Sequence, residues 1–261
     1  MAKIIAITNQ KGGVGKTSTA SALVSGLQEK GYKVLAIDLD PQGNLGVCFG
    51  ADTENAQSVY ELMKGTANIR KVLQHKNGVD IIAANMLLSG AELEFSEFGR
   101  EFRLKKGIAS IRDEYDYIVI DTPPALNILT VNAYVATDFL IIPMVPEILS
   151  LIGISQLADT VNLVKEVYNQ RLEVLGILLN KYDGRRVLTR DVEEMAKMVG
   201  TEMNTKVFRT KIRSSVAVAE APAHGISVFE YSPKSNATKD YRALVDEIIS
   251  QKGMKVNGKK G

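Results

Sequence analysis

The chain contains a single cysteine, no tryptophan and two histidines among its 261 residues. Because Cys48 stands alone, the sequence excludes a disulfide within the chain and any iron–sulfur or cysteine-rich metal site that one chain would have to build. Also missing are an apolar run approaching the roughly 18 residues that a membrane-spanning helix needs and a secretory signal before the first apolar segment. These absences predict a cytoplasmic protein with a free thiol.

An excess of charge of one sign is also missing, except at the end of the chain. The formal net charge is +2, yet residues 252–261 carry four lysines and no acid, which leaves a net of −2 for the rest. A global basic field for nucleic acid is therefore excluded, and any such binding must come from a local patch. With three glycines beside those lysines, residues 252–261 are predicted to form a basic, disordered tail behind one domain at residues 1–251.

Short apolar runs alternate with amphipathic stretches along the whole domain. Near-continuous aliphatic composition is typical of strands that are covered on both faces, as in a parallel sheet. Strands are predicted at residues 3–8, 33–38, 79–83, 117–121, 139–143 and 174–179, with weaker candidates at 206–209 and 226–231; helices are predicted at 16–30, 151–168 and 239–251. This alternation predicts an α/β fold, a single-domain, doubly wound, mostly parallel sheet flanked by helices.

A glycine-rich segment connects the first predicted strand to the first predicted helix. Glycines allow consecutive backbone N–H groups to point at phosphate oxygens at the positive end of a helix dipole. Lys16 is placed to reach the β and γ phosphates and the Thr17 hydroxyl to ligate Mg²⁺, although Gln10 replaces the glycine that usually opens such a loop. The predicted nucleotide-binding residues of this loop are Lys11, Gly12, Gly13, Val14, Gly15, Lys16, Thr17 and Ser18.

Three aspartates follow two of the predicted strands. Asp38 and Asp40 end the second strand, and Asp121 ends the strand at residues 117–121. Open α/β sheets place ligands at these carboxyl ends, so we expect Asp38 and Asp121 to hold waters of the Mg²⁺ shell. A further carboxylate near the γ-phosphate can orient the attacking water. Either Asp38 or Asp40 could instead cap a turn at the strand end.

The combined motifs resemble the ParA/MinD family of P-loop ATPases with a deviant Walker A loop, and among them the Soj-type ParA partition proteins. The resemblance covers about residues 1–250 and rests on Lys11-Gly12-Gly13-Val14-Gly15-Lys16-Thr17, Asp38-Leu39-Asp40-Pro41-Gln42-Gly43, Asp121-Thr122-Pro123-Pro124, Tyr182-Asp183-Gly184-Arg185 and Glu220-Ala221-Pro222. It implies an ATPase that uses ATP and Mg²⁺, forms a homodimer when ATP binds, and works with a ParB-like centromere-binding partner.

The same resemblance assigns roles to individual residues. Lys11 would reach across the dimer to the nucleotide of the other subunit, and Asp40 would support water attack beside Lys16, which makes these three the predicted catalytic residues. The segment after Asp121 would sense the γ-phosphate. Asn180 would hydrogen-bond the adenine edge; although the run from Asn180 to Asp183 also mimics the guanine-reading motif of GTPases, the loop is of the ATP-using type.

Nonspecific DNA binding is a further implication of the resemblance, since Soj-like ATP dimers bind DNA through basic residues late in the chain. Residues 181–213 hold nine lysines and arginines against five acids, a net of +4, which for an arbitrary protein would be read as a solvated surface. Relatives commonly have Ile-Pro-Arg-Asn-Val-Arg where this chain has residues 212–217, with Ala217 in place of the second arginine. The expected DNA contacts are therefore Arg185, Arg186 and Arg213, and the protein would associate with the nucleoid when ATP is bound.

Three alternatives compete with a partition ATPase. A MinD-like membrane-positioning ATPase needs a terminal amphipathic helix, and the tail offers only Met254 and Val256 as bulky apolar residues, so no stable membrane association is expected. A metabolic ATP-dependent ligase of the dethiobiotin-synthetase type would share the fold but would have no obvious use for Lys11. A regulatory switch that binds ATP without useful turnover is the third.

Overall fold

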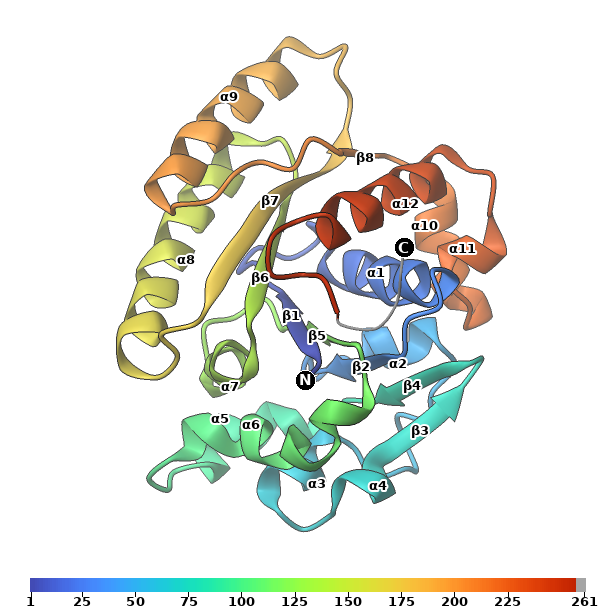
Figure 1. Cartoon of the computed structure of the whole chain (residues 1–261), viewed down its shortest axis with the longest axis vertical. Helices are drawn as coiled ribbons and strands as arrows, with labels where there is room; N and C mark the ends of the chain where they lie inside the picture. Colours follow the sequence, from blue (N-terminus) through green and yellow to red (C-terminus); the bar gives the residue numbers. More distant parts are fainter. Residues whose placement is uncertain (257–261) are drawn as a thin grey trace.

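Strands with apolar residues at nearly every position form the centre of the structure, a computed structural model that describes residues 1–256. They build one eight-stranded sheet in the order β3-β4-β2-β5-β1-β6-β7-β8, parallel throughout except for β3, which pairs antiparallel with β4 (Figure 1). The strands are β1 (Lys3–Ile7), β2 (Val34–Asp38), β3 (Leu73–Lys76), β4 (Val79–Ile82), β5 (Tyr117–Asp121), β6 (Phe139–Met144), β7 (Glu173–Tyr182) and β8 (Ile212–Arg213). The predicted fold class is confirmed.

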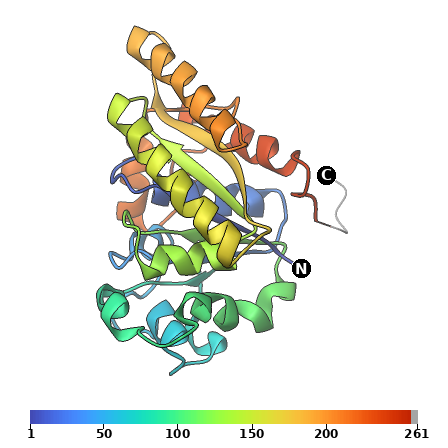
Figure 2. The ribbon, with the colours of Figure 1, turned by 90° about the vertical axis from the view of Figure 1, so that its left-hand side faces the viewer.

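Side chains alternate between the two faces of each strand, so the sheet supports two separate apolar clusters. Ile4 and Ala6 of β1 belong to the cluster that packs under α3, α6, α7, α8 and α9, whereas Ile5 and Ile7 belong to the one under α1, α2 and α12. Figure 2 shows α8 and α9 side by side on the first of these faces. The helices are α1 (Lys16–Glu29), α2 (Asn44–Cys48), α3 (Val59–Lys64), α4 (Ile69–Val72), α5 (Ala91–Glu94), α6 (Arg103–Ile108), α7 (Ile128–Ala136), α8 (Ile148–Val167), α9 (Val187–Glu202), α10 (Val216–Glu220), α11 (Val228–Tyr231) and α12 (Asn236–Ile249), with 3₁₀ turns η1 (Met86–Gly90), η2 (Arg100–Phe102), η3 (Ala109–Glu114) and η4 (Ala221–His224).

The two weaker strand predictions are wrong. Residues 206–209 contribute only an isolated bridge between Val207 and Ile177, and residues 226–231 contain α11 instead of a strand. The hydroxyl of Ser227 accepts a hydrogen bond from the Glu230 backbone N–H and so caps this short helix. The N-cap serine thus favours a helical turn in a segment whose aliphatic and aromatic residues had suggested a strand.

The predicted tail is partly described, since residues 257–261 lie outside the described residues. Met254 is completely buried, and its carbonyl accepts a hydrogen bond of 2.7 Å from the Tyr117 hydroxyl on β5. Residues just after α12 therefore pack against the sheet. Among residues 1–256, no helix combines the length and apolarity that crossing a bilayer would require.

The register of the parallel strands brings the predicted functional residues to one edge. Asp121 at the end of β5 is the register partner of Ile7 on one side and of Asp38 on the other. Because all three strands run in the same direction, the loop after β1 and the carboxylates after β2 and β5 emerge together. This edge is where the site forms.

Close packing of β7 generates a first prediction. A Cβ added at the buried Gly176 would lie 2.5 Å from Cε2 of Phe208, closer than two carbons can approach. We expect Gly176→Ala to lower the free energy of unfolding by about 1–3 kcal/mol through overpacking, measured by urea denaturation. The matched control is Gly153→Ala in α8. An added Cβ at this position has no neighbour within 4 Å, so the substitution should stabilise the helix by about 0.5–1 kcal/mol. Equal effects of the two substitutions would contradict this packing.

Candidate functional site

The loop between β1 and α1 has the conformation that its glycines permit. Gly13 and Gly15 adopt positive φ angles of 74° and 90°, and α1 begins directly after Gly15. A side chain at Gly15 would also collide with Asn180, because its Cβ would lie 2.6 Å from the amide nitrogen Nδ2. The loop therefore depends on glycine here for both its turn and its close approach to β7.

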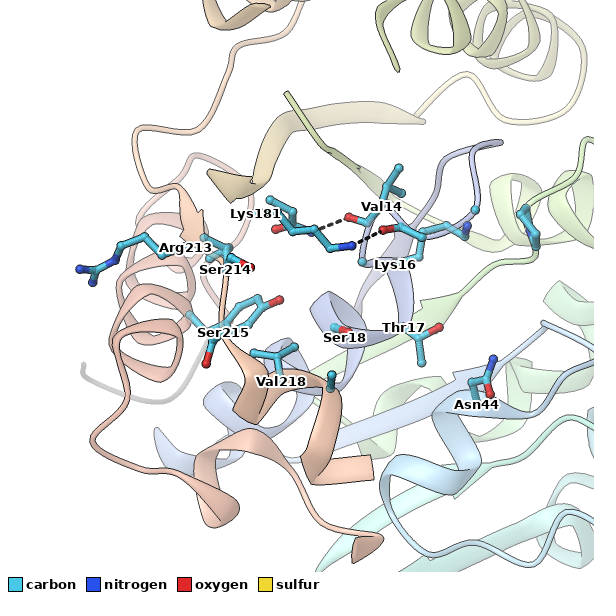
Figure 3. Close-up of a pocket in the computed structure, with 18 of the residues that line it drawn as sticks. Val14, Lys16, Thr17, Ser18, Asn44, Lys181, Arg213, Ser214, Ser215 and Val218 are labelled. Carbon is cyan, nitrogen blue, oxygen red and sulfur yellow. Dashed lines mark hydrogen bonds between the residues drawn. The ribbon is translucent and has the colours of Figure 1, made fainter. Parts of the chain in front are cut away.

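A pocket of about 370 Å³ opens beside this loop (Figure 3). Many predicted site residues line it, namely Gly12, Gly13, Val14, Gly15, Lys16, Thr17, Ser18, Asp40, Asn180 and Arg213. Lys11 does not line it, and neither do Asp38 and Asp121, which are completely buried at the strand ends. The structure thus brings most of the predicted nucleotide and catalytic residues around one pocket.

Lys16 and Thr17 connect the loop to the buried carboxylate of Asp121. The Thr17 hydroxyl donates a 2.5 Å hydrogen bond to Oδ2 of Asp121. Burial raises the pKa of Asp121 to about 7, against the lowering effects of Thr17 and Lys16. Burial also lowers the pKa of Lys16, although Asp121 and Asp40 oppose that shift, and the Lys16 ammonium donates to the Lys11 carbonyl at 3.2 Å.

Asp121 also has a carboxylate oxygen that could bind a cation. Its Oδ1 is buried and has no hydrogen-bond partner in the part of the chain that the structure describes. A carboxylate oxygen and a threonine hydroxyl next to each other suit Mg²⁺, a hard cation that keeps several of its waters. The residues present therefore fit the predicted metal ion.

Asp38 and Asp40 differ in what their carboxylates contact. The Asp38 carboxylate accepts hydrogen bonds from the backbone N–H groups of Asp40, Leu45 and Gly46, at 3.0, 2.9 and 3.2 Å. Burial and the neighbouring Asp121 raise the pKa of Asp38 well above its usual range. Asp40 keeps 8% exposure and lines the pocket, and its carboxylate accepts a hydrogen bond from the Gln42 backbone N–H at 3.0 Å. Asp38 thus holds the loop that presents Asp40.

Lys11 is bound to a residue that the sequence analysis did not select. Its ammonium lies 2.5 Å from Oε2 of Glu147 and 3.3 Å from the Ser150 hydroxyl, both on the loop and helix that follow β6. Glu147 precedes α8 yet makes no side-chain cap of that helix. Its position just after a strand of the same parallel sheet was the signal that could have identified it, since β6 ends at the edge where Lys11 lies.

Asn180 and Lys181 both contact the glycine loop from the end of β7. The Asn180 amide Nδ2 donates to the Val14 carbonyl at 2.8 Å and to the Thr19 hydroxyl at 3.2 Å, and the Lys181 ammonium donates to the Gly13 carbonyl at 3.1 Å. Asn180 was predicted as a site residue. Lys181 was not; the sequence analysis counted it only among the basic residues of 181–213.

The three arginines predicted to contact DNA are all paired with acids of the same chain. Arg185 donates through two nitrogens to Asp183 at 2.9 and 3.0 Å, and Arg186 lies 3.5 Å from the same carboxylate. The Arg185 hydrogen bonds lower the pKa of Asp183 to about 2. Arg213 donates to both oxygens of Asp240, at 2.9 and 2.7 Å. Only Arg213 borders the pocket; Arg185 and Arg186 lie outside it.

Comparison with known proteins gives full-length sequence relatives. A family profile described as an AAA domain matches residues 2–174. The chain is 41% identical over 256 residues to the sporulation initiation inhibitor protein Soj of Bacillus subtilis, covering 96% of this chain and 99% of Soj. It is 39% identical over 255 residues to the chromosome partitioning protein ParA of Caulobacter vibrioides, covering 95% and 94% of the two chains.

Solved structures with the same fold carry nucleotides. A cobyrinic acid a,c-diamide synthase of Mycobacterium smegmatis with a bound ATP analogue and magnesium superimposes with a TM-score of 0.82 at 32% identity, covering 94% of this chain and 93% of the other. A putative plasmid partition protein of Borrelia burgdorferi bound to AMPPNP gives a TM-score of 0.79 at 25% identity, covering 95% and 99%. Both resemble this chain over nearly its whole length.

The buried carboxylate of Asp121 generates a prediction on pH. Its pKa is about 7 in the folded chain against about 3.9 when unfolded, so ionisation opposes folding increasingly as the pH rises between these values. We expect Asp121→Asn to remove that penalty. In a buffer without nucleotide or magnesium, the variant should gain about 1–3 kcal/mol more unfolding free energy at about pH 8 than at about pH 5.

Asp159→Asn on the exposed side of α8 is the matched control and should follow the wild-type pH profile. If the free energy of unfolding of Asp121→Asn rises by the same amount at both pH values, or by more at the lower one, burial does not disfavour the ionised form of Asp121.

Proposed function

The chain belongs to the ParA/Soj family of P-loop ATPases, and on that basis we propose that it is a DNA-partition ATPase that dimerises on ATP, binds nonspecific DNA and hydrolyses ATP under stimulation by a ParB-like partner. Residues 1–251 form the ATPase unit. Its place is the cytoplasm, and the nucleoid when ATP is bound. What supports this most directly is the glycine loop, whose Lys16 and Thr17 line one pocket with Asp40 and whose Thr17 hydroxyl donates to the buried Asp121.

The proposed binding of ATP and Mg²⁺ follows from the donors around the loop. Residues 11–18 would hold the phosphates, Thr17 would ligate the metal directly, and the free oxygen of Asp121 would hold one of its waters. Asp38 would hold a water of the metal shell. It would also support the site indirectly, because its three backbone hydrogen bonds fix the loop that carries Asp40. Mg²⁺ would neutralise charge that develops on the phosphate oxygens.

Asn180 is compatible with adenine as the base. Its amide nitrogen is already used by Val14 and Thr19, and this fixes its orientation. The remaining Oδ1 is buried without a hydrogen-bond partner among residues 1–256, so it is available to accept a hydrogen bond. The exocyclic amino group of adenine supplies such a donor.

Hydrolysis then requires a group that orients water at the γ-phosphate. Asp40 is the carboxylate that reaches the pocket surface, and Lys16 of the glycine loop lines the same pocket. Positioning and charge stabilisation account for most of the catalysis of phosphoryl transfer. We therefore assign water orientation to Asp40 and charge stabilisation to Lys16.

Lys11 is the proposed link between two subunits. In the single chain its ammonium is paired with Glu147, whose side chain is 59% exposed, so the pair lies at the surface, where an ion pair contributes little. The phosphates of a nucleotide on a facing subunit carry more negative charge than one carboxylate. Lys11 would release Glu147 and bind the phosphates of that nucleotide, and it could do so only in the dimer.

The dimer generates a testable prediction. An Asp40→Ala variant should bind ATP but hydrolyse it slowly, because the residue that orients water is lost. It should therefore accumulate as an ATP-bound dimer at twice the monomer mass, measured by size-exclusion chromatography with light scattering. ADP should leave the same variant monomeric.

Adding Lys11→Ala to this variant is the control that separates binding from dimerisation. The double variant should still bind ATP, with the affinity lowered by less than about tenfold, and should remain monomeric. An Asp40→Ala protein that stays monomeric with ATP would contradict the role of Asp40, and a double variant that still dimerises would contradict the role of Lys11.

DNA binding is proposed for the surface around the start of α9. Arg185 and Arg186 are 91% and 77% exposed, and both share the single carboxylate of Asp183. One acid cannot neutralise two guanidinium groups, so positive charge remains for DNA phosphates. Arg213 would contribute less, because Asp240 binds it through both oxygens and is itself only 13% exposed.

Retention of the ATP-bound protein on nonspecific DNA should therefore depend on salt and on these arginines. Changing Arg185 and Arg186 to Ala should abolish retention near physiological salt, and should reduce the slope of log affinity against log salt by about 2. Arg171→Ala, at the opposite end of β7, should bind as the wild type does. Salt-insensitive retention, or equal losses for Arg171 and the arginine pair, would remove DNA from the proposal.

The similarity to the cobyrinic acid a,c-diamide synthase favours a second candidate, an ATP-dependent ligase that activates a small carboxylic acid. Turnover of ATP distinguishes the two functions. A ligase responds to its small acid, whereas a partition ATPase responds to DNA together with its partner protein. Lys11, paired with Glu147 at the surface, has no evident task in a ligase acting on a small molecule, which is why we place that function second.

A further inference from the structure

The end of β7 is irregular where it passes the glycine loop. Asn180 pairs with Ile212 and Tyr182 pairs with Arg213, and the register shifts between them, which leaves Lys181 as an extra residue. Lys181 has a φ of 51°, in the left-handed region that a residue with a side chain seldom adopts. Irregularities of this kind next to active sites change the direction in which a side chain points.

The consequence is that two consecutive side chains reach the same target. In a regular strand Asn180 and Lys181 would point to opposite faces of the sheet. Here the Asn180 amide donates to the Val14 carbonyl at 2.8 Å, and the Lys181 ammonium donates to the Gly13 carbonyl at 3.1 Å. Figure 3 shows Lys181 extending toward the loop segment that carries Val14 and Lys16.

These two hydrogen bonds determine where the neighbouring N–H groups point. The described chain contains no cis peptide bond, and in a trans peptide the C=O of one residue and the N–H of the next point in opposite directions. When the carbonyls of Gly13 and Val14 are held toward β7, the N–H groups of Val14 and Gly15 must turn away from β7. Such N–H groups are the donors with which a glycine loop binds phosphate.

We propose that Lys181 is a positioning residue for nucleotide binding, which holds the glycine loop in the conformation that presents the Val14 and Gly15 N–H groups to the phosphates. It acts through the Gly13 carbonyl and does not touch the reacting atoms. The inference deepens the proposed function and rests on it, because the ligand of the loop is taken to be ATP.

A lysine suits this position for two reasons. The loop is rich in glycine and has little intrinsic preference for one conformation, so an external hydrogen bond reduces the entropy that ATP binding must otherwise remove. The hydrogen bond from a charged donor is also stronger than one between neutral groups. Glycine would fit the left-handed backbone with less strain, yet it would leave the Gly13 carbonyl without this partner.

The test compares three substitutions of Lys181 in the full chain, with binding of a fluorescent ATP analogue and steady-state hydrolysis as readouts. Lys181→Met keeps the length and removes the donor, Lys181→Gly removes the side chain and relieves the backbone strain, and Lys181→Arg keeps a charged donor. Lys239→Met, on the exposed side of α12, is the control for loss of one positive charge. Thermal melting verifies that each variant is folded.

We expect Lys181→Met and Lys181→Gly to weaken ATP binding about tenfold and to raise KM in proportion, while kcat at saturating ATP stays within about twofold of the wild type. Lys181→Arg should recover most of the affinity, and Lys239→Met should bind as the wild type does. Wild-type affinity in the Met or the Gly variant would overturn the proposal. So would a fall in kcat at unchanged KM, because Lys181 would then act on the reacting atoms.

These outcomes are separate from those that test the proposed function. If the wild-type chain does not bind the ATP analogue, the proposed function fails. If the wild type binds it and Lys181→Met binds it equally well, only the role of Lys181 fails.

Discussion

Two buried carboxylates next to each other are the constraint around which the site is built. Asp38 and Asp121 are register partners at the ends of β2 and β5, and both are completely buried. Two carboxylates so placed cannot both ionise without compensation, and the pKa of each is raised, mainly by burial. The Lys16 ammonium, the Thr17 hydroxyl and the backbone N–H groups after Asp38 are what offset that cost. A cation at this edge would complete the compensation, so the same residues suit a metal ion and phosphate together.

The parallel sheet also explains why Lys11 and Glu147 meet. Both residues follow strands that end at the same edge, and their contact joins positions 136 residues apart in the sequence. The attraction is real but lies at the surface, where solvent weakens it. Lys11 is therefore held by Glu147 through an ion pair that costs little to break. In the proposed dimer this arrangement makes a cation available to a facing nucleotide at little cost in stability.

Acids next to the arginines change how the basic surface should be understood. A count of charges along residues 181–213 suggests a row of free cations, whereas Asp183 and Asp240 already engage the three arginines of interest. Shared or exposed pairs can exchange a carboxylate for a phosphate, but a bidentate pair with a mostly buried partner does so less readily. The difference separates Arg185 and Arg186 from Arg213. Structure thus ranks contacts that sequence could only group together.

Six of the eight strands, the glycine loop and the three aspartates could be predicted from the sequence, because each depends on patterns within one segment: continuous apolar runs, glycines at fixed offsets before Lys16 and Thr17, and carboxylates directly after strands. The short edge strands β3 and β8 were not predicted. Tertiary structure decided what those segments meet. Glu147 reaches Lys11, Asp38 binds backbone N–H groups instead of facing the pocket, and the irregular end of β7 turns Lys181 toward Gly13. Residues 226–231 became a helix because Ser227 caps them. Contacts between distant segments and the direction of a side chain at a strand irregularity depend on backbone geometry, which periodicity and composition do not encode.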